Sequence, residues 1–114
     1  MLHYVFNRTI VLHLFTNNLS PGKSTVIGDI TEATGVGYVS LSLTGGSWSY
    51  ATVLGVNQAS YATQTFTMTG AITVYGYYLT TTDGLLYIER FPTAPYILPS
   101  DGGEIIVNPL FNLN

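Results

Sequence analysis

Cysteine is absent from this chain of 114 residues. A disulfide framework, a thiolate nucleophile and a cysteine-ligated zinc site are therefore all excluded. The length suits one domain that can bury a single sizeable core. We therefore expect one β-sandwich domain over residues 1–114, stabilised by packing and hydrogen bonding.

Charged side chains are scarce as well, at 8% of the residues, against roughly 25% in an ordinary soluble domain. Hydrophobic residues, in contrast, reach 46%. Charges alone do not cover such a surface, so Thr, Ser, Asn, Gly and Tyr must cover it, or a partner must. The composition indicates a protein that assembles with others.

Positive charge is confined to Arg8, Lys23 and Arg90, and the formal net charge is −3. Because no basic patch is available for a phosphate backbone, we expect no nucleic-acid binding. No apolar run approaches the ~18 residues of a membrane span. The run IVLHLF at residues 10–15 is shorter than a signal-peptide core, and no A-x-A site follows it. We interpret it as a strand, and expect neither membrane insertion nor general secretion.

Helical periodicity is missing, whereas short apolar or alternating runs are separated by Gly, Pro, Asn and Asp. The abundant Thr, Tyr, Val and Ile are typical of half-buried strands. This pattern predicts an all-β fold, an antiparallel β-sandwich or jelly roll. The predicted strands are residues 9–16, 37–44, 48–53, 64–69, 72–80, 85–91 and 104–113.

The segment ITVYGYYLTTTDGLLYIERF, residues 72–91, predicts a hairpin rich in aromatic side chains. Side chains alternate across a strand, so Tyr78 should face one way, and Tyr75 and Tyr77 the other. The Asp-Gly pair at residues 83–84 supplies the expected tight turn. Because both faces are apolar, we predict that one packs inside the sandwich and the other meets another subunit.

Two long connections, residues 17–37 and 92–103, contain both Gly and Pro. The first has no clear pattern of its own, which in a compact domain is typical of a functional loop or arm. The second is rich in Pro and Gly, and is expected to run extended over the surface.

Two glycine motifs imitate nucleotide-binding sequences but lack their context. PGKST at residues 21–25 ends like a phosphate-binding loop, yet Asn17 stands where the first glycine belongs and no helix pattern follows. GVGYVS at residues 35–40 begins like a dinucleotide fingerprint, but Ser40 replaces the third glycine and a strand pattern follows. We interpret the first as a solvated turn carrying Lys23, and the second as backbone freedom at a strand entrance.

Candidate catalytic and metal-binding residues are few. His3 and His13 lie far apart in the sequence, and His13 alternates with leucines, so it is expected to face solvent or a neighbour rather than a metal. No G-x-S-x-G motif is present, and neither histidine has an obvious orienting acid. We therefore expect no enzymatic activity, no metal site and no cofactor.

Loop carboxylates form two pairs, Asp29 with Glu32 and Asp101 with Glu104. Paired carboxylates serve in glycoside hydrolysis, and carboxylates combined with loop carbonyls bind calcium. Neither pair lies in a recognisable ligand sequence, so we interpret all four as solvated loop charges.

The adjacent charges Glu89 and Arg90 should face opposite sides of their strand. One of them then faces the interior or an interface, where it needs a partner. The pair indicates either an edge strand protected by charge or an ion pair between subunits.

A series of landmarks runs through residues 12–113: an early apolar strand ending in Phe-Thr, a Gly-Tyr at a strand entrance, a Trp, a Gly-aromatic-aromatic strand, and a glycine-rich turn before a strand with Asn-Pro. The chain carries them as Phe15 and Thr16, Gly37 and Tyr38, Trp48, Gly76 with Tyr77 and Tyr78, and Gly102, Gly103, Asn108 and Pro109. Together they resemble a family of small structural proteins encoded by tailed bacteriophages. The chain departs from that family at two places, because residues 39–41 are Val-Ser-Leu where an Arg is usual, and Glu104 follows the last glycine in place of Asp.

The resemblance implies a β scaffold and a virion setting rather than a particular chemistry. Low charge, the aromatic hairpin and the long loops favour a capsid decoration or cement protein. The expected protein is a homotrimer that is made in the host cytoplasm and binds the major capsid protein on the virion. The candidate interface residues are Tyr75, Tyr77, Tyr78, Tyr87, Glu89, Arg90 and Trp48.

Two alternatives stay open. A tail, baseplate or neck component of the virion would share the same scaffold. A carbohydrate-binding module would use Trp48 or the tyrosines as stacking platforms for a host glycan.

Overall fold

The structure, a computed structural model, describes residues 9–44 and 47–112. The described elements are β1 (Ile10–Phe15), the 3-10 helix η1 (Ile27–Asp29), β2 (Leu41–Leu43), β3 (Ser49–Val53), β4 (Val56–Ser60), β5 (Gln64–Met68), β6 (Ile72–Val74), β7 (Gly76–Thr81), β8 (Gly84–Arg90), β9 (Tyr96–Leu98), β10 (Gly103–Val107) and β11 (Leu110–Asn112). The predicted all-β, antiparallel sandwich is confirmed, and no α-helix occurs in these residues. The jelly-roll strand order stays a prediction.

The first layer is a four-stranded antiparallel sheet in the order β2-β1-β7-β8. The chain enters β7 directly from β6, which pairs with β9. The two parts join at Tyr75, whose N–H donates to the Phe15 carbonyl and whose carbonyl accepts from the Phe91 N–H, each at 2.9 Å. The strand predicted at residues 72–80 is therefore one run of chain that changes its partners at Tyr75.

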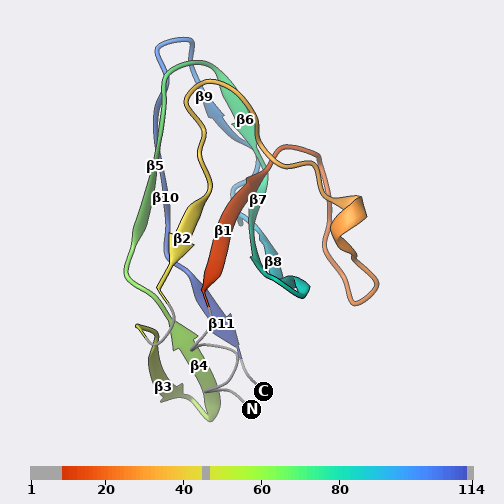
Figure 1. Ribbon diagram of the computed structural model, residues 1–114, viewed down its shortest axis with the longest axis vertical. Helices are drawn as coiled ribbons and strands as arrows, with labels where there is room; N and C mark the ends of the chain where they lie inside the picture. Colours follow the sequence, from red (N-terminus) through yellow and green to blue (C-terminus); the bar gives the residue numbers. More distant parts are fainter. Residues whose placement is uncertain (1–8, 45–46, 113–114) are drawn as a thin grey trace.

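The second layer is a long ribbon (Figure 1). Its upper part is the antiparallel pair β5–β10, and its lower part is the three-stranded sheet β11-β4-β3. The Tyr61 N–H donates to the Pro109 carbonyl at 3.1 Å and links the two parts. In Figure 1, β5 and β10 lie to one side of the four-stranded sheet, so the molecule is a sandwich of two unequal layers.

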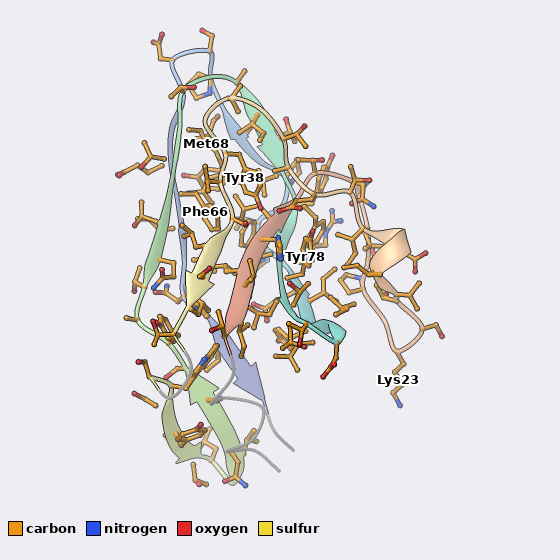
Figure 2. The ribbon with its side chains drawn as sticks, in the orientation of Figure 1. Lys23, Tyr38, Phe66, Met68 and Tyr78 are labelled. Atoms are coloured by element: carbon orange, nitrogen blue, oxygen red, sulfur yellow. The ribbon has the colours of Figure 1, made fainter. Side chains whose placement is uncertain are left out.

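The core lies between these layers because alternate side chains of their strands are apolar. Trp48 joins it from the segment before β3 and makes an edge contact with Tyr61, with ring centroids 5.3 Å apart. Figure 2 shows Phe66 and Met68 of β5 between the ribbon and the sheet. The main contributors, each at most 3% exposed, are Leu12, Leu14, Tyr77 and Leu79 from the sheet and Phe66, Met68, Ile105 and Val107 from the ribbon.

Several strand boundaries differ from those predicted. β2 begins at Leu41 rather than at residue 37, because Gly35, Val36 and Gly37 have φ values of 73°, 45° and 79°, which an extended strand does not permit. The strand predicted at 104–113 is divided between β10 and β11 around Pro109, which has no N–H to donate. β4 and β9 lie outside the predicted strands, because β4 is mostly polar and β9 is only three residues long.

The β7–β8 hairpin is confirmed, but its turn lies one residue earlier than predicted. Thr81 pairs with Gly84, so the two turn residues are Thr82 and Asp83 rather than Asp83 and Gly84. Gly84, with a φ of 121°, opens the returning strand. Such a φ favours glycine, which accounts for its place after the turn.

Residues 17–37, which we call the arm, leave β1, form η1 and return to the end of β1. The Thr16 N–H donates to the Thr31 carbonyl and the Ala33 N–H donates to the Leu14 carbonyl, each at 2.9 Å. Phe15 and Glu32 form a β-bridge between these bonds. Figure 1 shows the arm on the side of the sheet away from the ribbon. The second long connection, residues 92–103, contains β9 and is therefore only partly a loop.

Candidate functional site

The seven candidate interface residues separate into two groups. Tyr77, Tyr78 and Trp48 are only 2%, 4% and 5% exposed, so they belong to the interior of the single chain. Of the rest, Glu89 is exposed, and the other three are half-buried: Tyr75, Tyr87 and Arg90. The seven side chains therefore do not form one exposed patch.

The outer face of β7 is covered by its own chain. Tyr78 stacks on the imidazole of His13, with ring centroids 4.5 Å apart and an interplanar angle of 13°. Burial and the nearby Glu32 charge raise the pKa of Tyr78 to about 12. The prediction that this face meets another subunit is wrong for Tyr78, because β1 and the arm already occupy it.

The inner face of β7 is core. The Tyr77 ring makes tilted contacts with Tyr87 and Phe91, at centroid distances of 6.3 and 6.2 Å. The Tyr77 hydroxyl donates to the Leu110 carbonyl at 3.4 Å, so this side chain also connects the sheet to the end of the ribbon. Burial, reinforced by the charge of Glu89, raises the pKa of Tyr77 and keeps the phenol neutral.

Arg90 holds the arm against β8. Its Nη1 donates to Asn18 Oδ1 at 2.6 Å and to the Leu19 carbonyl at 3.2 Å. The guanidinium lies over the Tyr75 ring, 5.1 Å from its centroid. Arg90 is therefore positioned by contacts with Asn18, Leu19 and Tyr75 of its own chain. The ion pair between subunits stays a prediction.

Glu89 remains accessible on β8. Its Oε1 accepts a hydrogen bond from the Tyr87 hydroxyl at 3.2 Å. Burial, with the Glu89 charge beside it, raises the pKa of Tyr87 to about 12. β8 is an edge strand, paired with β7 alone within the described residues, so Glu89 fits the interpretation of an edge protected by charge.

A cluster of four polar side chains, which we call the His13 cluster, joins β1, β7 and the arm. The Nδ1–H of His13 donates to Glu32 Oε2 at 2.7 Å, and its Nε2 lies 2.8 Å from the Thr80 hydroxyl. The Tyr38 hydroxyl donates to the same Glu32 oxygen at 2.7 Å, and accepts from the Leu14 N–H at 3.1 Å. The His13 side chain is 14% exposed, so it does not face solvent, and both of its ring nitrogens contact side chains of its own chain.

Glu32 is accordingly not a solvated loop charge. Asp29, Asp101 and Glu104 are exposed as predicted, but Asp29 lies in η1 and Glu104 lies on β10 rather than in a loop. Glu32 is also the orienting acid for His13, which the sequence alone does not reveal. Thr80, His13 and Glu32 follow the hydroxyl–imidazole–carboxylate order of nucleophilic triads. The ring of Tyr78 covers the imidazole, however, so the geometry favours a structural bridge over an open catalytic site.

PGKST is a turn, as interpreted, whereas the two glycines of GVGYVS lie before β2 and not at its entrance, although both do have positive φ values. In PGKST, the Thr25 N–H donates to the Gly22 carbonyl at 3.1 Å and the Gly22 N–H donates to Thr25 Oγ1 at 2.9 Å. Lys23 projects away from the molecule at this turn (Figure 2). In GVGYVS, the Val36 carbonyl accepts from the Thr69 N–H at 2.7 Å, which attaches the end of the arm to the turn after β5.

Several large apolar side chains lie on the surface. Leu54 is the extreme case, at 99% exposed and with a φ of 53°. No sequence pattern identifies it, because neither β4 nor the turn before it is evident from the residues. The exposed large apolar and aromatic residues are Val26, Ile27, Val39, Tyr50, Leu54, Tyr96, Ile97, Ile106 and Leu110.

An open groove of about 600 Å³ lies between the tip of the arm and β8. One wall is the PGKST turn and the other is the apolar half of the edge strand. Its lining residues are Pro21, Gly22, Lys23, Thr25, Leu85, Leu86, Tyr87 and Ile88. In the described residues, no group of three His, Asp or Glu side chains is arranged to bind a metal ion, and no helix has the length and apolar character needed to cross a membrane.

Comparison of the chain with protein-family profiles, curated proteins and solved structures gives no match.

Proposed function

We propose that this chain is a structural protein of a tailed-phage virion that decorates the capsid and stabilises it by binding. The observation that carries the proposal is the surface of the molecule. Only 8% of the residues are charged, and exposed apolar side chains occur on both layers and on the arm. One exposed leucine needs no explanation, so the proposal rests on the scarcity of charge combined with the number of exposed large apolar side chains.

The scaffold suits such a role because its binding surfaces are carried by a rigid sandwich. Each contact with a coat protein or another copy would bury about 800 Å² per partner. Repetition of a modest contact over a symmetric shell multiplies the effective affinity. A protein that binds the assembled shell and not its free subunits stabilises the shell by mass action.

Carbohydrate binding is the second candidate, with stacking residues other than Trp48. Trp48 is 5% exposed and packs in the core, so it offers no platform to a sugar. Among the described side chains, Tyr50 and Tyr96, at 45% and 43% exposed, are the most exposed aromatic rings and are the ones we propose to stack on a glycan. Binding on a glycan array that is lost in Tyr50→Ala or Tyr96→Ala, with the fold retained, would favour this function.

Copy number in purified particles of the phage that encodes this chain tests the proposal. Quantitative mass spectrometry should give a ratio near parity with the major capsid protein. A handful of copies would instead assign the chain to the tail, baseplate or neck. Absence from the particle would overturn the virion function altogether.

A further inference from the structure

The tip of the β3–β4 hairpin has an unusual residue in a familiar turn. Val53 pairs with Val56, which leaves Leu54 and Gly55 as the two turn residues, with φ values of 53° and 82°. Two successive positive φ values are typical of a type I′ turn, in which Asn-Gly is the preferred pair. Leucine occupies the position where asparagine would fit the backbone best.

Neither the backbone nor the packing of its own chain accounts for Leu54. The left-handed region is unfavourable for a residue with a bulky side chain, and this side chain lies 99% exposed beyond the hairpin. The hairpin below it belongs to a three-stranded sheet, since β4 pairs with both β3 and β11, and the Thr52 hydroxyl donates to Asn57 Oδ1 across the strands at 2.7 Å. An unfavourable residue held outward on a firm support indicates a role in contact with another molecule.

The groove beside β8 is the complementary feature. One wall of the groove is formed by apolar side chains of β8, and Pro21 belongs to the opposite wall. Lys23 is the one charged residue in the lining, and it projects away at the rim (Figure 2). The wall formed by the arm is held in place by the hydrogen bonds from Arg90 to Asn18 and Leu19.

We propose that the Leu54 tip of one copy of this chain inserts into the β8 groove of a second copy. In Figure 1 the β3–β4 hairpin forms the lower end of the molecule, whereas the arm lies on the right side of the molecule. Because the tip and the groove are apart, a chain does not fill its own groove. The contact joins two different surfaces and is therefore heterologous. Repeated head-to-tail, it closes into a ring such as the expected trimer, or it extends as a filament.

Charge supports a second copy as the occupant. Residues 49–60, which form the whole hairpin, contain no charged side chain, so insertion removes no charge of the hairpin from water. An acidic or phosphate-bearing partner would find only Lys23 at the groove. The inference concerns the purified chain, and it stands or fails independently of the virion function.

The first test is the oligomeric state of matched variants, measured by analytical ultracentrifugation. Leu54→Asn removes the apolar tip and suits the turn, and Gly22→Phe fills the groove. A Cβ on Gly22 meets no atom within 4 Å, and the same holds for Gly28, which does not line the groove. Gly28→Phe and Val39→Asn are therefore the controls. Both test variants should weaken self-association at least tenfold, and both controls should leave it unchanged.

Disulfide cross-linking then tests the geometry, and the chain suits it because it contains no cysteine. Leu54→Cys and Gly22→Cys proteins, mixed and oxidised, should give a mixed dimer and few homodimers. Leu54→Cys homodimers alone would show a two-fold, tip-to-tip contact and overturn the proposal. A wild-type chain that stays monomeric at every concentration, together with cysteine variants that give no mixed dimer, would overturn it too.

Discussion

The β7–β8 and β3–β4 hairpins both close with two-residue turns, yet they lie in opposite surroundings. β7 carries Tyr77 and Tyr78, and its own chain buries both of them. The β3–β4 hairpin is mostly polar, yet it ends in the fully exposed Leu54. A high density of aromatic residues thus identifies the interior of this fold. Leu54, an apolar side chain at a backbone position that disfavours it, is the residue that we propose to contact a second copy.

The position of β7 explains why its aromatic residues are unavailable. β7 lies between β1 and β8 within the sheet, with the ribbon on one face and the arm on the other. The fit is close at Gly76, where a Cβ would meet the Glu89 carbonyl oxygen and would lie 2.6 Å from the Phe15 ring. Tyr77, Tyr78 and Leu79 of this strand are therefore buried within the single chain.

The largest effect is expected from Tyr77→Ser. Removing this buried ring should lower the free energy of unfolding by about 3–5 kcal/mol, as for other large aromatic truncations. Tyr50→Ser on the β3–β4 hairpin is the control, since Tyr50 is 45% exposed, and it should change stability by about 0.5 kcal/mol or less. Chemical denaturation measures both. A Tyr77→Ser monomer as stable as the wild type would mean that this ring serves an interface and not the core.

Glu32→Ala should have the next largest effect. It leaves the His13 Nδ1–H and the Tyr38 hydroxyl without the acceptor that they share. Unpaired, partly buried donors of this kind should cost about 2 kcal/mol of the free energy of unfolding. Glu104→Ala, at an exposed carboxylate on β10, is the matched control. Equal denaturation midpoints for the two variants would show that the His13 cluster does not hold the arm to the sheet.

Alkaline pH should separate the buried tyrosines from the others. Burial raises the pKa values of Tyr38, Tyr77, Tyr78 and Tyr87, whereas the unfolded value is about 10. Their contribution to stability is therefore complete below pH ~10 and is lost as the pH rises through the folded values, because the folded chain then binds more protons than the unfolded chain.

The measurement is tyrosinate absorbance followed together with far-ultraviolet circular dichroism between neutral pH and strongly alkaline pH. These four tyrosines should ionise only together with unfolding. Complete ionisation near pH 10 in a chain that keeps its native circular dichroism would contradict the burial of these four tyrosines.

The smallest effect has the opposite sign. Leu54→Asn should raise the free energy of unfolding of the dilute monomer by about 1 kcal/mol, because asparagine tolerates the left-handed conformation better than leucine. A rise of about 4–8 °C in the melting temperature corresponds to that change. Val39→Asn, at another exposed site, should leave it unchanged. A destabilised Leu54→Asn monomer would show that Leu54 packs within its own fold.

Local patterns predict much of the fold and little of the site. Short apolar runs such as β1 and β7, separated by Gly, Pro, Asn and Asp, are enough to indicate an all-β sandwich. The polar run Val56–Ser60 conceals β4, and with it the turn that presents Leu54. Glu32 and Thr80 lie 19 and 67 residues from His13. They meet it through strand register and the return of the arm, which no short-range pattern encodes.

Hydrogen–deuterium exchange of the wild-type chain at low and high protein concentration tests the contrast between the two hairpins most directly. We expect the amides at residues 53–56 and 21–25 to gain protection as concentration rises, because the tip then occupies the groove. The amides of Gly76–Thr81 should be protected equally at every concentration. Protection of β7 that depends on concentration, with an unchanged β3–β4 tip, would contradict the account.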